Sequence, residues 1–254
     1  MTRIYHYCRM DRNGCPSCGG MDFRQSPILT DSLALAWELT DNERFRFDER
    51  EGHTCLNCGM SKRVRMLYWS IKRLLPDFQQ LDILHINRIN GLSQPLRAAR
   101  TLVETVHRPD LPFGALVEGY VNQDMTGLKF TDCAFDVVIH SETLEHVHDY
   151  EKALSEATRV LRSGGRQFYT VPLLHNRLTR RRMIVGTNSE RIDLLPLSFH
   201  GNEGEYPVVW EFGGDFLQKR KAHIAQIHYD DYWSNPTIFT IIEPKSPFSA
   251  DYAD

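Results

Sequence analysis

Residues 135–172, FDVVIHSETLEHVHDYEKALSEATRVLRSGGRQFYTVP, decide the fold class. FDVVIHS is an apolar run of strand length, and DYEKALSEATRVLR repeats apolar residues at helical spacing along one face. Gly164 and Gly165 are expected to end that helix, and RQFYTVP follows as the next strand. A strand, a helix and a strand in this order predict two parallel strands joined by a crossover helix.

The same alternation extends toward the N-terminus. LDILHI (81–86) is expected to be a buried strand, and LSQPLRAAR a helix with Ser93 as its cap and Pro95 in its first turn. RTLVETV and LVEGYVNQD are expected to add further strands. The sequence therefore predicts an α/β fold with a doubly wound, mostly parallel sheet of the Rossmann-like type.

The last two strands are expected to pair differently. GGDFLQKRKA should form a helix, followed by the strands AHIAQIHY and PTIFTIIEP with only DDYWSN between them. A parallel pair needs a longer crossover, so these strands should form an antiparallel hairpin at one edge of the sheet.

Two matched cysteine pairs precede this domain. CPSCGG contains Cys15 and Cys18, and CLNCGM contains Cys55 and Cys58. A glycine after each pair is typical of a zinc knuckle, and two knuckles supply the four ligands of a closed, structural tetrahedral site. The alternative is two unrelated thiol pairs, and four thiolates would also suit iron.

The segment between the pairs, ILTDSLALAWELTD, suits a short helix capped at Thr30 or Asp31, or an irregular loop. SKRVRMLYWSIKRLLP has the apolar spacing of an amphipathic helix that ends at Pro76. We therefore expect a zinc-binding module with its linking helix over residues 1–75 and the larger domain over residues 76–254.

Composition limits the function classes. The 254 residues are 41% apolar and carry a net charge of −3, which disfavours binding of nucleic acid through a globally basic surface. The charged N-terminal residues have no apolar signal segment, and no apolar run is long enough to span a bilayer. We expect a cytoplasmic protein that does not enter a membrane, whose oligomeric state the sequence leaves open.

Two stretches, LDILHINRINGLSQPL and FDVVIHSETLEHV with the later RVLRSGG, resemble the class I S-adenosylmethionine-dependent methyltransferases. CLNCGMSKRVRML resembles the second knuckle and following helix of a bacterial subgroup with an N-terminal zinc ribbon. In that subgroup LHI replaces the glycine-rich first motif. The resemblance covers roughly residues 50–172 and implies S-adenosylmethionine as cofactor.

The resemblance also implies roles for individual residues. The turn after the first strand should admit the amino-acid end of the cofactor, an acid on the second strand should bind the ribose diol, and an acid after the third should meet the adenine. The candidates for the turn are Ile86, Asn87 and Gly91, and the candidate for the ribose is Glu104. Asp124 and Met125 are the candidates for the adenine. His140, Ser141 and Glu142 are expected next to the methionine portion. Glu104 could equally be a solvated strand-end glutamate.

Catalysis of methyl transfer mainly requires alignment of the nucleophile with the leaving group. A base is needed only if the nucleophile is a hydroxyl or a protonated amine. His175 and His200 are the candidate bases, although ordinary loop histidines are the simpler interpretation. Glu145 and His146 invite a general-base or metal interpretation, but their position in the family favours bracing the cofactor loop.

The segment from Leu173 to Phe212, here called the insertion, should cover the substrate. It holds an arginine cluster that suits an anionic group, or that is simply solvated: Arg177, Arg180, Arg181, Arg182 and Arg191. We expect O-methylation of a small molecule or glycan, such as a nucleotide-sugar or polysaccharide. The alternatives are an RNA methyltransferase, favoured by Lys62, Arg63, Arg65, Lys72 and Arg73, and a non-catalytic binding module.

Overall fold

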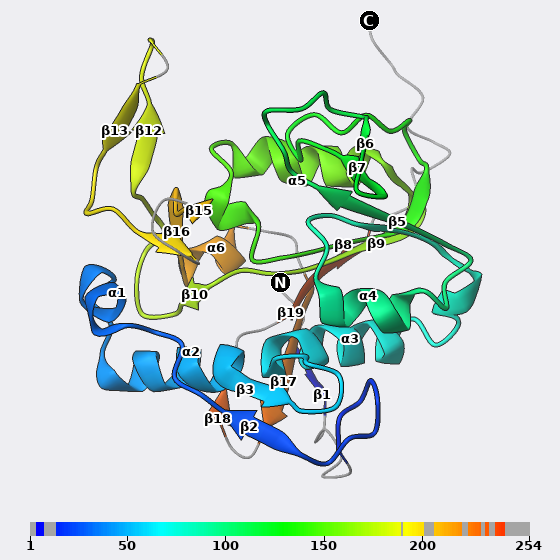
Figure 1. The fold of residues 1–254 in the computed structure, drawn as a ribbon, viewed down its shortest axis with the longest axis horizontal. Coiled ribbons are helices and arrows are strands. Elements are labelled where there is room, and N and C mark those ends of the chain that lie inside the picture. The colour runs from blue at the N-terminus through cyan, green and yellow to red at the C-terminus, as the bar shows by residue number, and fades with distance from the viewer. Residues whose placement is uncertain are drawn as a thin grey trace, which may run out of the picture.

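The computed structural model describes residues 4–7, 14–188, 190–200, 206–219, 223–229, 232–233 and 237–241. Its largest sheet has the order β1-β17-β19-β9-β8-β4-β5-β7-β6 (Figure 1). The strands that form its centre are β4 (Asp82–His85), β5 (Thr101–Val106), β7 (Tyr120–Asn122), β8 (Phe135–Ser141) and β9 (Leu161–Thr170). These neighbours pair in parallel, which confirms the doubly wound sheet.

Antiparallel strands complete both sides of the sheet. β6 (Leu116–Val117) pairs with β7, and β17 (His223–Tyr229) pairs with β19 (Thr237–Ile241) as the expected hairpin. β19 lies between β9 and β17, so the outermost strand on that side is β1 (Ile4–Tyr7), which runs parallel to β17. β18 (Tyr232–Trp233) extends the hairpin.

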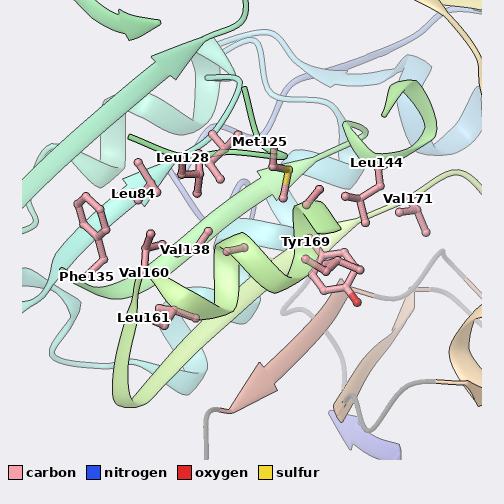
Figure 2. Packing of buried hydrophobic residues seen from close by; sticks show 14 of the residues in the cluster. Leu84, Met125, Leu128, Phe135, Val138, Leu144, Val160, Leu161, Tyr169 and Val171 are labelled. Atoms are coloured by element: carbon pink, nitrogen blue, oxygen red, sulfur yellow. The ribbon is translucent and has the colours of Figure 1, made fainter. Parts of the chain in front are cut away.

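Helices cover both faces of the sheet. α3 (Lys62–Leu74) and α4 (Asn90–Leu96) pack on one face, where Leu67 and Ile71 meet Ile83 and Val137. α5 (Tyr150–Arg159) packs on the other face against the cluster drawn in Figure 2, which includes Val138. Successive residues of β8, Val137 and Val138, therefore contribute to the cores on opposite faces of the sheet, as expected for a strand covered on two sides.

Two helix boundaries differ from the sequence expectation. α4 begins at Asn90, so Ser93 is not its cap, and Pro95 lies in its last turn. The Ser93 hydroxyl instead donates to the Ile89 carbonyl, 3.0 Å away. α5 ends at Arg159, and Leu161 already pairs with Phe135 in the sheet, because the buried β8–β9 ladder outcompetes a further helical turn.

The N-terminal module consists of β2 (Phe23–Gln25), α1 (Asp31–Ala36), α2 (Asp41–Gly52) and β3 (His53–Cys55). Thr30 caps α1 as one of the two expected caps. α2 was not expected, although Thr40 and Glu43 form a reciprocal capping box at its start, a pattern visible in the sequence. Short 3-10 turns follow at η1 (Phe78–Gln80) and η2 (Leu144–His146).

The insertion folds into short strands: β10 (Leu173–Leu174), β11 (Arg180–Arg181), β12 (Met183–Val185), β13 (Arg191–Asp193), β14 (Phe199–His200), β15 (Tyr206–Pro207) and β16 (Trp210–Gly213). The helix expected over GGDFLQKRKA is limited to α6 (Asp215–Gln218), and residues 220–222 lie outside the described part. Among the described residues no helix has the length and apolar character needed to cross a membrane.

Candidate active site and thiolate cluster

The four cysteines of the two pairs converge on one point. Their sulfur atoms all lie within 4.8 Å of one another, with Cys15 Sγ 3.5 Å from Cys58 Sγ and Cys18 Sγ 3.7 Å from Cys55 Sγ. Tetrahedral zinc with bonds of about 2.3 Å requires sulfur separations of roughly 3.8 Å. The donor set therefore fits zinc, which remains a prediction.

Glycines shape both knuckles. The Gly19 amide donates to the Cys15 carbonyl and the Gly59 amide to the Cys55 carbonyl, and both glycines have positive φ. A Cβ on Gly20 would lie 2.9 Å from the Cβ of Asn57 and 3.3 Å from two of the cysteine sulfurs. The second residue after the first pair, Gly20, must therefore be small for the thiolates to approach one another.

The turn after β4 is fixed to the end of β5. Asn87 adopts a positive φ of 51°, and its amide donates to Thr105 Oγ1 at 3.2 Å. The Ile86 amide donates to the Ile139 carbonyl of β8 at 2.8 Å. The turn therefore lies at the carboxyl edge of the parallel strands, where open α/β sheets bind ligands.

Gly91 lies in the first turn of α4, where it contacts the segment after the second knuckle. A Cβ there would lie 2.9 Å from Met60 Cγ, in the segment that follows the second knuckle. The absence of a side chain thus allows α4 to pack against the N-terminal module.

Glu104 faces the side of the sheet that α4 covers. One of its oxygens, Oε1, accepts from Ser93 and lies 3.3 Å from His85 Nδ1, and these contacts lower the pKa of the carboxyl. Its side chain is only 10% exposed. In the described part of the chain no hydrogen bond reaches its second oxygen, which is available for a ligand hydroxyl.

The end of β7 carries the expected acid. Asp124 accepts from the amide and hydroxyl of Thr126 at 2.7 and 2.8 Å. Met125 is buried in the core beside it. The neighbouring Gln123 is 2% exposed, and its Nε2 has no hydrogen-bond partner among the residues that the structure describes. A buried unpaired donor is costly unless a ligand satisfies it, and the sequence pattern gave no reason to select Gln123.

His140, Ser141 and Glu142 lie in three different environments. His140 is fully buried and stacked on Tyr169, and burial lowers its pKa to about 3, so it is neutral at pH 7. The Ser141 hydroxyl contacts Arg63 and Thr170. Glu142 reaches a pocket, where its Oε2 accepts from Arg50 Nη2 at 3.1 Å.

This pocket has a volume of about 740 Å³. Its walls come from both parts of the chain: α1 and α2 provide Trp37, Phe47 and Arg50, and the insertion provides Phe199 and His200. Glu142 after β8 and Pro172 after β9 also line it. The pocket therefore adjoins the carboxyl edge of the central sheet.

Comparisons with known proteins find similarity to methyltransferases. Residues 89–169 match the family model described as a methyltransferase domain. A curated protein of Encephalitozoon cuniculi that carries a methyltransferase name is 27% identical over 110 residues, which are 42% of this chain and 45% of the relative. The match thus spans less than half of that relative's length.

Solved structures with similar folds include a 1,6-didemethyltoxoflavin-N1-methyltransferase of Burkholderia thailandensis and an S-adenosylmethionine-dependent methyltransferase of Mesorhizobium loti. The first is 12% identical with a TM-score of 0.43, covering 71% of this chain and 78% of its own. The second is 14% identical with a TM-score of 0.40, covering 69% and 96%.

The match to the family model lies over residues 89–169, and the central strands of this region pair in parallel, as expected from the sequence. This part of the chain is therefore similar to a methyltransferase domain.

The methyltransferase domain offers suitable groups for the cofactor. Glu104 has an oxygen for a ribose hydroxyl, Asp124 has a carboxylate near the end of β7, and Gln123 has an unpaired buried donor. The residues present therefore fit S-adenosylmethionine, whose contacts with individual side chains remain predictions.

The two candidate bases of the methyltransferase domain lie apart. His200 lines the large pocket, 3.5 Å from Glu145 Oε1. His175 lines a separate small pocket with Phe47 and Arg46. Glu145 is completely buried, and burial raises the pKa of its carboxyl. His200 and Glu145 thus form a pair that their sequence separation concealed.

The insertion arginines already have protein partners. Arg177 donates to the Trp37 carbonyl and lies 3.4 Å from Glu43, so it joins the insertion to the N-terminal module. The remaining pairs are Arg180 and Arg182 with Glu211, Arg181 over the Trp210 ring, and Arg191 with Asp193. These contacts disfavour the cluster as an open anion site.

The basic residues beside the second knuckle are also largely internal. Lys62 pairs with Glu49 at 2.6 Å, and the buried Arg65 donates to the carbonyls of His53 and Met60. Of the five basic residues selected from the sequence, only Lys72 and Arg73 are exposed. Two exposed residues do not make an extended basic face, so the observation that favoured RNA is weakened.

Proposed function

We propose that the chain transfers the methyl group of S-adenosylmethionine to a hydroxyl group of a small molecule or a glycan unit. The observation that carries the proposal is the 740 Å³ pocket that opens beside the carboxyl ends of β8 and β9 in a methyltransferase domain. Pockets of roughly 300–1,000 Å³ are typical for small ligands. In this proposal residues 76–254 form the methyltransferase domain and residues 1–75 the metal-bound module that supplies one pocket wall.

The chemistry requires little of the protein. A lone pair of the acceptor oxygen forms a bond to the methyl carbon while the carbon–sulfur bond breaks and its electron pair returns to sulfur. The hydroxyl proton passes to water or to a nearby base. Bound S-adenosylmethionine supplies an already activated methyl group, so alignment of donor and acceptor provides most of the rate. The pocket suits this task because it combines the apolar Trp37 and Phe199 with the polar Arg50 and Glu142.

Calorimetric titration with S-adenosylmethionine tests the proposal. The zinc-loaded protein should bind the cofactor with micromolar affinity, and Asn87→Ala and Asp124→Ala should each weaken binding. Asp132→Ala, an exposed residue paired with Arg159, is the matched control. A folded, metal-loaded protein that does not bind the cofactor would instead support the non-catalytic binding module.

Pocket variants then test the acceptor side. Leu33→Trp should fill the pocket from α1 and reduce methylation of small hydroxyl compounds without changing cofactor affinity. Equal turnover by this variant and the unchanged protein would place the acceptor elsewhere.

A further inference from the structure

Glu145, His146 and His200 gather beside the pocket in an arrangement that bracing the cofactor loop does not explain. Their ligand atoms all lie within 4.8 Å of one another. His146 Nε2 is 3.7 Å and His200 Nδ1 is 3.5 Å from Glu145 Oε1. Ligands at about 2.1 Å around a tetrahedral ion are separated by roughly 3.4 Å, so small side-chain movements would bring these atoms to a common ion.

The carboxylate of Glu145 is the second observation. Its side chain has no solvent exposure, and among the described residues neither of its oxygens has a hydrogen-bond partner. An unpaired buried carboxylate is strongly unfavourable unless a proton or a cation satisfies it. A ring nitrogen of each neighbouring imidazole lies within 4 Å of one of these oxygens, Oε1.

The imidazole of His146 is held in the orientation that a metal ligand needs. Its Nδ1 lies 2.9 Å from the Pro207 carbonyl, to which it can donate, and this leaves the Nε2 lone pair toward Glu145. Such a backbone carbonyl commonly fixes the tautomer of a metal-binding histidine. The His146 and His200 rings are nearly perpendicular, with centroids 4.8 Å apart.

We propose that Glu145, His146 and His200 bind a divalent first-row transition-metal ion at the edge of the acceptor pocket. Two imidazoles and one carboxylate suit such an ion and leave coordination positions open. Because His200 lines the pocket, the open positions would face the space assigned to the acceptor. Glu142 lines the same pocket, and in the described part of the chain its buried Oε1 has no hydrogen-bond partner. This role rests on the proposed function: the ion would bind the hydroxyl of the acceptor and favour loss of the hydroxyl proton.

Titration of the zinc-loaded protein with Co²⁺ tests the site without requiring activity. One further equivalent of Co²⁺ should bind and give visible ligand-field bands without sulfur-to-cobalt charge transfer, because the ligands are nitrogen and oxygen. His200→Ala and Glu145→Gln should each weaken this binding at least about tenfold. His148→Ala, which alters an exposed histidine of the same segment, should leave it unchanged.

Calorimetry with S-adenosylmethionine on the same variants separates this proposal from the proposed function. Cofactor affinity should be unchanged in His200→Ala, because His200 lines the acceptor pocket and is not among the residues assigned to the cofactor. Absence of a second Co²⁺ equivalent, or His200→Ala binding Co²⁺ as tightly as the unchanged protein, would overturn the metal site. If Glu145→Gln does not fold, the His200→Ala result decides.

Discussion

Arg50 and Glu142 form an ion pair of 3.1 Å between α2 of the N-terminal module and the turn after β8. Their side chains are 5% and 14% exposed. Arg50 thus connects the two parts of the chain at the wall of the acceptor pocket, where its charge also meets Glu51 at 2.8 Å. This single residue links pocket shape to the position of the module.

Replacing Arg50 with methionine should therefore destabilise the protein by about 3 kcal/mol, because it removes the arginine that pairs with the largely buried Glu142 carboxylate, whereas Glu51 keeps Arg63. The free energy of unfolding from urea titration measures the effect. Arg46→Met on the same helix removes only a hydrogen bond to Asn42 and should cost less than about 1 kcal/mol. Equal losses in both variants would contradict the role given to Arg50.

Removal of the thiolate-bound metal should unfold the N-terminal module and open the pocket. Chelation, or Cys55→Ser, is expected to release one equivalent of zinc and to lower the thermal unfolding midpoint, because structural zinc supplies folding free energy directly. Metal analysis and thermal unfolding measure both effects. Cys133→Ser, at an exposed cysteine outside the cluster, should change neither.

The sequence predicts the fold well where periodicity and motif agree. The residues of β4, β8 and α5 have clear apolar patterns, and the matched knuckles allowed the cysteine cluster to be anticipated. Boundaries were less accurate where a local signal competed with the sheet, as when Leu161 joined β9 instead of extending α5.

The polar groups of the pocket could not be derived in the same way. Arg50, Glu142 and His200 are far apart in the chain, and only the docking of the module and the insertion brings them together. A charged residue in a sequence is expected to be solvated, so nothing local indicated that Arg182 would be buried against Glu211. The roles of these charged residues depend on which distant segments bury them, and this information is not local in the sequence.

Gly91→Ala tests whether this glycine serves packing rather than the cofactor. The new Cβ would lie 2.9 Å from Met60 Cγ, so we expect a loss of about 1–2 kcal/mol in unfolding free energy. Combining it with Met60→Ala should cost less than the sum of the two single changes, since the shortened side chain removes the clash. Strict additivity in the double-mutant cycle would contradict this packing role.

Asp82, at the start of β4, is expected to make the stability of the protein depend on pH. It accepts from Arg100 at 2.6 Å and from Arg162 at 2.9 Å, and the hydrogen bond from Arg100 holds the pKa of its carboxyl well below the usual value. Because the folded pKa is lower than the unfolded value of about 3.9, the ionised carboxylate stabilises the fold above that pH. The contribution is lost as pH falls below it.

Urea midpoints measured between about pH 6 and pH 3 should therefore fall less steeply for Asp82→Asn than for the unchanged protein. Asp22→Asn, at an exposed position, should retain the full slope, and a parallel decline in all three proteins would show that Asp82 is not a source of the acid sensitivity.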